Sequence, residues 1–349
     1  MTRPISTAVL SYGMSGRVFH CPLLNTHPGF SLDAIVKRNN HDPVPLYPQA
    51  KIINSVDEAV HDPDIELIIV NVPNGFHFDY ASRALRAGKH VVVEKPFTVT
   101  STEAAALIDL SIECKRLLIV FQNRRWDGGF LTIKKILEEK QLGRIVECEM
   151  HYDRFRNYIQ PNTWKEDQGP GSGILYNLGS HLIDQALSLF GIPDFVDARL
   201  GVQRTGGQVD DFYDIRMEYK NMLVILKSSY LVREPGPGYV VHGEMGSFVK
   251  YGVDPQEQAL NEGKRPGTEG WGKEPESFWG KLNTVVEGGH YEGLIETIPG
   301  NYSVFYDNVH DCIRNGGLPK VRHEESLVLI KIIEACMESS KLKRAIKII

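Results

Sequence analysis

The sequence contains no run of about 18 or more uncharged apolar residues, the minimum for a helix that spans a bilayer. No charged and apolar leader precedes the first apolar run, so we expect neither a secretory signal nor a membrane span. Basic residues are not in excess, because 39 Lys and Arg stand against 44 Asp and Glu. A protein that binds the phosphate backbone needs the opposite balance, so nucleic acid is not an expected partner.

Cysteine is scarce and follows no pairing pattern. The cysteines are odd in number and widely spaced, and no C-x-x-C pair occurs. This pattern favours reduced, buried thiols, and therefore a cytoplasmic protein. The residues concerned are Cys21, Cys114, Cys148, Cys312 and Cys336.

The composition is that of a globular protein. Hydrophobic residues make up 42% and charged residues 24%, which excludes disorder for most of the length. A length of 349 residues predicts two domains. We find no internal repeat.

The first third alternates short apolar runs with helical patterns, which is typical of βαβ units in a doubly wound parallel sheet. Capping boxes at Ser55/Glu58 and Thr100/Glu103 begin two of the helices, and Gly88 ends a third. The predicted strands cover 5–10, 32–36, 66–72, 90–93 and 117–121.

The pattern changes after Gln122. Apolar and polar residues alternate over 146–153, and 212–226 has the pattern of a hairpin, as in antiparallel strands with one wet face. Short strands are predicted within 238–251, loops over 254–300, and two helices at 303–314 and 324–340. We therefore predict an α/β protein: a nucleotide-binding domain at 1–122, then an α+β domain at 123–349 with a large, mostly antiparallel open sheet. The last helix is able to pack back on the first domain, and partner subunits commonly cover such a sheet.

The first predicted strand runs into a glycine-containing turn that resembles the G-x-G-x-x-G dinucleotide motif, with Ser11 in the first glycine place and Gly13 and Gly16 in the others. Such a turn presents backbone N–H groups to phosphates at a helix N-terminus. The alternative is a tight loop without a ligand. The residues around this turn are Met14, Ser15, Arg17 and Val18.

Two cations, Lys37 and Arg38, follow the second strand, where an acidic residue would bind the ribose of NAD. Basic side chains there accommodate the 2′-phosphate of NADP, and Arg38 is the better candidate because its guanidinium pairs bidentately. The pattern favours NADP over NAD. The alternative is a solvated basic loop.

Polar residues also end two further parallel strands, at Val72-Pro73-Asn74 and at Glu94-Lys95-Pro96. Open α/β sheets bind their ligands at this edge. Lys95 is a candidate donor to a substrate hydroxyl, and a neighbouring pyridinium charge would lower its pKa toward the range useful in acid and base catalysis. The alternative is a loop lysine paired with Glu94.

In the second domain, a helix that starts near Leu175 places Asn177 and His181 on one face, with Asp184 three residues further. An amide, an imidazole and a carboxylate then share that face. A structural histidine is the alternative. A metal site is not expected, because no second His or Cys stands at ligand spacing.

In combination, these motifs resemble the glucose-fructose oxidoreductase / inositol dehydrogenase / MocA (Gfo/Idh/MocA) family along the whole chain. The most specific segment is Gly88 to Phe97, which contains Glu-Lys-Pro. Arg124 to Trp126, His242 to Lys250 and Asp254 to Glu257 resemble the branch that holds NADP-dependent scyllo-inositol 2-dehydrogenase. The other segments are Ser11 to Gly16, Val72 to His77, Gln122 to Trp126, Asn177 to His181, His242 to Lys250 and Asp254 to Glu257.

The resemblance implies a Rossmann domain, a C-terminal domain whose sheet packs against another subunit in a homodimer or homotetramer, and oxidation of a secondary alcohol on a cyclic polyol or sugar. Lys95 then positions the reacting hydroxyl and His181 is the general acid/base. The family usually has Asp where this chain has Asn177, so either Asp184 supplies the charge or turnover is impaired. Ser11 and Gly129 also depart from the family pattern. Further cofactor-binding candidates are Asn71, His77, Glu94, Pro96, Asn123 and Arg124.

Several residues are candidates for substrate contact, although each is equally able to serve packing: Arg125, Trp126, Trp164, Asp184 and Tyr302. The leading hypothesis is an NADP-dependent polyol or sugar dehydrogenase. The alternatives are a nucleotide-binding sensor that has lost turnover, which Asn177 favours, and a glycosidase of the same family that uses nicotinamide transiently.

Overall fold

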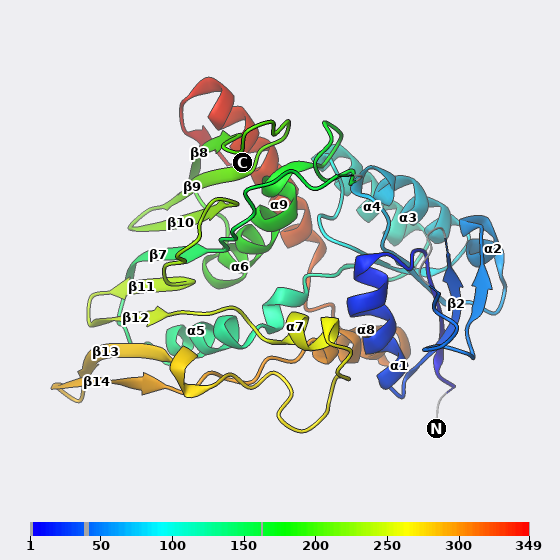
Figure 1. The fold of residues 1–349 in the computed structure, drawn as a ribbon, viewed down its shortest axis with the longest axis horizontal. Helices are drawn as coiled ribbons and strands as arrows, with labels where there is room; N and C mark the ends of the chain where they lie inside the picture. Colours follow the sequence, from blue (N-terminus) through cyan, green and yellow to red (C-terminus); the bar gives the residue numbers. More distant parts are fainter. Residues whose placement is uncertain (1–2, 38–41, 162, 349) are drawn as a thin grey trace. The chain divides into compact units, whose positions relative to one another are not determined.

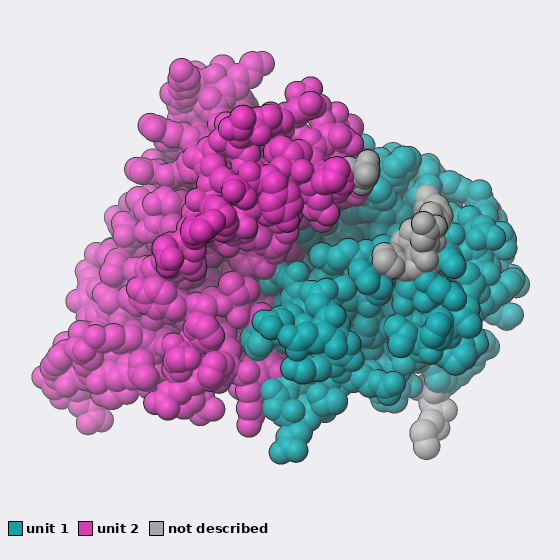
Figure 2. Space-filling model, viewed as in Figure 1, with its two compact units in different colours: residues 1–126, 255–271, 301–327 teal, residues 127–254, 272–300, 328–349 magenta. Residues whose placement is uncertain are grey.

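The computed structural model describes residues 3–37, 42–161 and 163–348 (Figure 1). The chain divides into two compact units, coloured separately in Figure 2. Two segments that lie beyond the predicted domain boundary at residue 122 belong to unit 1. Unit 1 comprises Met1–Trp126, Pro255–Trp271 and Asn301–Leu327, and unit 2 comprises Asp127–Asp254, Gly272–Gly300 and Val328–Ile349.

Unit 1 is built on a six-stranded parallel sheet with the order β3-β2-β1-β4-β5-β6. This is the strand order of a dinucleotide-binding fold, so the predicted doubly wound sheet is confirmed. β1 and β4 are buried throughout, because helices cover a parallel sheet of this kind on both faces. The strands are β1 (Ile5–Val9), β2 (Phe30–Val36), β3 (Lys51–Ile53), β4 (Leu67–Val70), β5 (His90–Val93) and β6 (Leu118–Val120).

Local sequence signals set several helix ends in unit 1. The predicted capping box at Thr100 and Glu103 is present, and Gly88 follows α3 with a φ of 76°. The Ser55 hydroxyl accepts from Asp57 N–H at 3.1 Å. Within the described part of the chain, however, the Glu58 side chain does not accept the reciprocal bond from Ser55 N–H. The helices are η1 (Gly16–His20), α1 (Cys21–Thr26), α2 (Val56–His61), η2 (Asn74–Phe76), α3 (His77–Arg86), α4 (Ser101–Glu113), η3 (Asn123–Trp126), α7 (Gln256–Asn261) and α8 (Ser303–Asn315).

Unit 2 is built on a nine-stranded sheet with the order β14-β13-β12-β11-β7-β10-β9-β8-β15. Among the described strands of this sheet, β7 and β10 pair in parallel and the other pairings are antiparallel, as predicted for this domain. Figure 1 shows α5 and α6 along one face of this sheet. The first strands are β7 (Ile145–His151), β8 (Phe195–Gly201), β9 (Phe212–Tyr219), β10 (Met222–Ser229), β11 (Tyr239–Gly243) and β12 (Gly246–Lys250).

The prediction of loops over 254–300 is wrong. This stretch holds α7, η5 (Glu276–Phe278) and the hairpin of β13 (Gly280–Val286) and β14 (Gly289–Ile295). β14 carries two glycines and is exposed along most of its length, so pairing with β13 stabilises it without the apolar alternation that marks a strand in sequence. β3 was also not predicted, because it has only three residues.

Unit 2 also contains α5 (Gly128–Glu138), η4 (Leu175–Gly179), α6 (Ser180–Phe190) and β15 (Ile346–Lys347). The long helix α9 (His323–Leu342) begins in unit 1 and ends in unit 2. All cysteines are free thiols. The expectation that they are buried holds for Cys21, Cys148 and Cys336, but Cys114 and Cys312 are partly exposed because they lie near the C-terminal ends of surface helices. No helix among the described residues is long and apolar enough to cross a membrane.

Candidate active site

The glycine turn after β1 requires glycine at one position. A Cβ at Gly16 would collide with the Ser11 carbonyl oxygen and lie 2.8 Å from the Asn71 side-chain nitrogen. Ser11 replaces a motif glycine without loss of the turn, because its hydroxyl accepts from Gly13 N–H at 3.2 Å. The turn then leads directly into η1, where Arg17 N–H donates to Gly13 at 2.9 Å. Met14 and Arg17 are exposed, Ser15 is half-buried and Val18 is buried.

Asn71, at the end of β4, has an unused acceptor beside this turn. Its amide nitrogen donates to the Ser11 carbonyl at 2.7 Å, while its Oδ1 is buried and has no hydrogen-bond partner within the described ranges. Buried acceptors are normally satisfied, so this oxygen suits a donor from a bound ligand. The tight turn and the open acceptor together fit a dinucleotide whose phosphates face the start of η1.

A basic residue, Lys37, directly follows β2. Lys37 is half-buried, its N–H donates to Ile53 of β3 at 2.9 Å, and its ammonium lies 3.8 Å from the Asp42 carboxylate. Arg38, the other predicted cation, lies outside the described residues. A cation directly after β2 is compatible with a 2′-phosphate, and the Asp42 carboxylate lies beside that cation.

His77 holds together two turns at the carboxyl edge of the sheet. Its ring is fully buried, with one nitrogen 2.8 Å from the Pro96 carbonyl and the other 2.9 Å from the Val72 carbonyl. Burial lowers the pKa of His77, and a neutral ring donates to only one of these carbonyls at a time. The turn of Pro73 and Asn74 is thereby fixed beside the Glu-Lys-Pro turn.

The Glu-Lys-Pro turn follows β5, and its glutamate is buried. One Glu94 oxygen accepts from Lys95 N–H at 3.0 Å and the other lies 3.0 Å from His20 Nε2. Burial alone would raise the pKa of Glu94, but the hydrogen bond from His20 and the charge of Lys95 outweigh burial and lower it. Lys95 itself is half-buried, and the Lys95–Pro96 peptide bond is cis. The Glu94 carboxylate thus holds the backbone of Lys95 through a hydrogen bond.

The segment after β6 is buried and bonded to later parts of unit 1. Arg124 pairs with Glu257 of α7, and Arg125 pairs with Glu325 of α9 at 2.8 Å. The Trp126 carbonyl accepts from Gln256 Nε2 at 3.2 Å. Asn123 and Tyr302 are buried as well, and Tyr302 packs its ring 6.1 Å from that of Phe19. These side chains stabilise unit 1, and their predicted contacts with cofactor or substrate stay predictions.

In unit 2, Asn177 and His181 lie one turn apart, since η4 continues directly into α6. Asp210 holds the start of this helix, because its carboxylate accepts from Leu175 N–H at 2.8 Å. Gly173, with a φ of 86°, leaves room for that carboxylate, which a Cβ would strike. Burial raises the pKa of Asp210 against the effect of the N–H donors. His181 and Asp184 are buried, Asn177 is half-buried, and Trp164 is 36% exposed.

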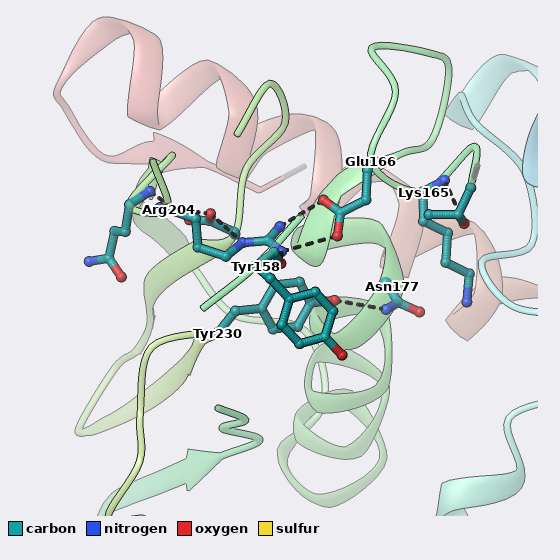
Figure 3. Close-up of polar contacts among 9 residues, drawn as sticks. Tyr158, Lys165, Glu166, Asn177, Arg204 and Tyr230 are labelled. Carbon is teal, nitrogen blue, oxygen red and sulfur yellow. Dashed lines mark hydrogen bonds and ion pairs between the residues drawn. The ribbon is translucent and has the colours of Figure 1, made fainter. Parts of the chain in front are cut away.

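Asn177 is held by a polar network (Figure 3). Its amide nitrogen donates to the Tyr230 hydroxyl at 3.3 Å, and the Arg204 guanidinium lies 4.7 Å from the centre of the Tyr230 ring. Arg204 pairs with Glu166 at 2.7 Å and with Asp211 at 2.9 Å. This buried ion-pair network joins the loop that carries Trp164 and Glu166 to the tyrosine that contacts Asn177.

Sequence reasoning missed His20, Tyr230 and Arg204. No local signal marks His20, because it lies in an apolar helical stretch and its partners, Glu94 and Tyr306, are remote in sequence. Arg204 lies among glycines and polar residues that are typical of a surface loop, and only the fold buries it. Among the described residues, no group of three or more His, Cys, Asp or Glu is arranged to hold a metal.

Comparison with known proteins assigns both parts of the chain to one family. Residues 5–122 match the model of the oxidoreductase family NAD-binding Rossmann fold, and residues 134–348 match that of the oxidoreductase family C-terminal alpha/beta domain, both Gfo/Idh/MocA.

The similarity to these relatives covers nearly the whole chain. It is 40% identical to the scyllo-inositol 2-dehydrogenase (NADP(+)) IolW of Bacillus subtilis, over 98% of this chain and 95% of that protein, and 38% identical to the uncharacterised oxidoreductase YdgJ of Escherichia coli, over 98% of each. The solved structure of yvaA from Bacillus subtilis superposes with a TM-score of 0.96 at 39% identity and covers 99% of both chains. The structure of an oxidoreductase from Bacillus cereus gives 0.89 at 32% identity and covers 98% of both. The chain therefore belongs to the Gfo/Idh/MocA family of oxidoreductases.

Proposed function

We propose that this protein is an NADP-dependent dehydrogenase that oxidises a secondary alcohol on a cyclic polyol or sugar, of which scyllo-inositol is the model. The observation that carries the proposal is the Glu-Lys-Pro turn after β5, where a buried glutamate bonds the backbone of Lys95 at the ligand-binding edge of a dinucleotide-type sheet. The 40% identity to an NADP-dependent scyllo-inositol dehydrogenase supports this substrate class.

The chain's own residues supply binding and proton transfer. When bound, the nicotinamide supplies the acceptor for the hydride that leaves the carbinol carbon. Lys95 donates a hydrogen bond to the reacting hydroxyl and orients it. His181 accepts the hydroxyl proton as the C–O bond becomes a carbonyl, and returns it in the reverse direction. Asn177, one turn before His181, orients this end of the helix through its bond to Tyr230.

The proposed cofactor preference depends on the end of β2. Lys37 directly follows β2, in the place where an acid would bind a ribose hydroxyl, and its ammonium lies 3.8 Å from the Asp42 carboxylate. The 2′-phosphate of NADP is attracted by that cation and by the guanidinium of Arg38, the next residue in the sequence. We therefore propose NADP, with NAD bound more weakly.

We further propose a cytoplasmic homodimer or homotetramer assembled through the open sheet of unit 2, with domains at 1–122 and 123–349. The hairpin of β13 and β14 supports self-association, because it exposes large apolar side chains beside charged ones. These are Val285, Val286, Tyr291 and Leu294.

The test is the reduced-nicotinamide absorbance of the purified protein with NADP, then NAD, over a panel of inositols and hexoses. Sustained reduction of NADP by one polyol supports the proposal, and a preference for NAD contradicts the role of Lys37. Tight cofactor binding with no turnover on any polyol favours a sensor, the second function that Asn177 suggests. Release of a glycosidic leaving group without net cofactor reduction would favour a glycosidase.

A further inference from the structure

His20 is a buried titratable residue with no role in the proposed reaction. It ends η1, four residues after Gly16 of the dinucleotide-type turn, and its side chain is fully buried. Aromatic rings surround it: the Phe121 ring lies 4.4 Å away and the Tyr306 ring 6.3 Å away. A polar ring in such a place needs partners for both of its nitrogens.

Both nitrogens have partners, and the partners fix the proton positions. Tyr306 Oη lies 2.6 Å from His20 Nδ1, and burial keeps the pKa of Tyr306 well above its usual value, so the phenol retains its proton. The Glu94 carboxylate only accepts, so Nε2 carries a proton and donates to it at 3.0 Å. In the neutral ring Nδ1 is then the acceptor, and it accepts from the phenol.

The same hydrogen-bond chain continues to the proposed catalytic lysine. The second oxygen of Glu94 accepts from the backbone N–H of Lys95 at 3.0 Å. Tyr306, His20, Glu94 and Lys95 thus form one continuous chain that connects α8, η1 and the turn after β5. Glu94 thus bonds both Lys95 N–H and His20, with one oxygen for each.

We infer that His20 and Tyr306 are positioning residues for Lys95: Tyr306 donates to His20 Nδ1, and His20 holds Glu94 in the orientation that fixes the lysine turn. This inference rests on the proposed function, because it assumes that Lys95 contacts the substrate. The arrangement also connects the helix that follows the glycine turn to the lysine turn through one imidazole ring.

Three substitutions at His20 separate positioning from packing. His20→Gln keeps an N–H donor within reach of Glu94. His20→Asn is too short to reach Glu94 but keeps an acceptor near Tyr306, and His20→Leu keeps only the bulk. We expect kcat to stay within about threefold for the Gln variant and to fall about 10- to 100-fold for the Asn and Leu variants, with the affinity for NADP nearly unchanged.

Tyr306→Phe tests the outer end of the chain, and Tyr219→Phe is its control. The Tyr219 hydroxyl donates to the Gly191 carbonyl at 3.0 Å in unit 2, so this variant also loses one phenolic hydrogen bond. We expect Tyr306→Phe to lower kcat by about three- to tenfold and Tyr219→Phe to leave it unchanged. If the His20→Leu variant does not fold, the comparison of His20→Gln with His20→Asn decides whether His20 positions Lys95.

A second measurement does not depend on turnover: the rate at which a limiting acylating reagent modifies Lys95, followed by peptide mass spectrometry. The Asn and Leu variants should change this rate, and the Gln variant should restore it. The inference is overturned if kcat and the labelling of Lys95 are the same in all three His20 variants as in the unaltered protein. If the unaltered protein oxidises no polyol, the proposed function fails, and the labelling pattern alone then decides whether His20 positions Lys95.

Discussion

The side-chain amide of Asn177 donates a hydrogen bond of 3.3 Å to the hydroxyl of Tyr230. A tyrosine hydroxyl accepts from an amide but donates equally well to a carboxylate. The Arg204 guanidinium lies 4.7 Å from the centre of the same ring, but Glu166 and Asp211 already pair with it, so the group that receives a carboxylate at position 177 is the Tyr230 hydroxyl. The surroundings of Asn177 are therefore able to receive the aspartate that the family usually has there.

Asn177→Asp should raise kcat for polyol oxidation by about tenfold or more, because a carboxylate one turn before His181 stabilises the imidazolium that forms when the hydroxyl proton is taken. Steady-state kinetics over a pH series measures the change. The increase should be smaller in a Tyr230→Phe background, where the carboxylate loses the Tyr230 hydroxyl as a donor. An Asp variant that is no faster than the original protein would contradict the general-base role of His181 or the importance of this position.

Arg204→Met should destabilise unit 2 by about 3–5 kcal/mol, because it leaves the buried carboxylates of Glu166 and Asp211 without their cation. Urea unfolding measures the loss. Arg144→Met is the matched control: Arg144 pairs with Glu244 at 2.7 Å, but both side chains are about half exposed. The Arg144→Met variant should lose less than about 1 kcal/mol of unfolding free energy. Equal losses of unfolding free energy in the two variants would mean that the buried ion pairs of Arg204 stabilise the protein no more than an exposed pair does.

The sequence was sufficient to predict those features that depend on near neighbours. The alternation over 146–153 predicted β7, and the spacing of Thr100 and Glu103 predicted the capping box. The position of Lys95 directly after an apolar strand predicted its place at the edge of the sheet.

Features that depend on remote partners were not predictable. The His20 ring bonds Glu94 and Tyr306, 74 and 286 residues away in sequence, and nothing near His20 indicates either contact. β14 was missed for a related reason: its exposed, glycine-containing sequence forms a strand because β13 pairs with it. The ion pairs of Arg124 and Arg125 likewise depend on residues of α7 and α9.

Asp210 should make stability depend on pH in the sense opposite to that of a salt-bridged carboxylate. Burial raises its pKa above the usual 3.8 in the folded protein, so the folded state binds the proton more tightly than the unfolded state. This contribution to stability is complete below pH 3.8 and is lost as the pH rises through the higher folded pKa.

Asp210→Asn should remove that dependence. The amide oxygen of Asn still accepts from Leu175 N–H and carries no charge to desolvate. At neutral pH the variant should be at least as stable as the original protein, and its advantage should shrink as the pH falls toward 4. Urea unfolding of both proteins across that range measures the difference. A variant that is less stable than the original protein at neutral pH would show that the charge of Asp210 holds the start of η4.

Gly16→Ala should abolish tight cofactor binding while the protein stays folded. An added Cβ would collide with the Ser11 carbonyl and press on the Asn71 amide nitrogen, so the turn must move away from the position that presents its N–H groups to phosphates. We expect the Kd for NADPH, measured by fluorescence titration, to rise by about 100-fold, which corresponds to about 2.7 kcal/mol. Gly236→Ala is the control, because a Cβ there meets no atom within 4 Å. If Gly16→Ala binds NADPH as tightly as this control does, the glycine turn does not hold the dinucleotide, and the cofactor site must be sought elsewhere in the chain.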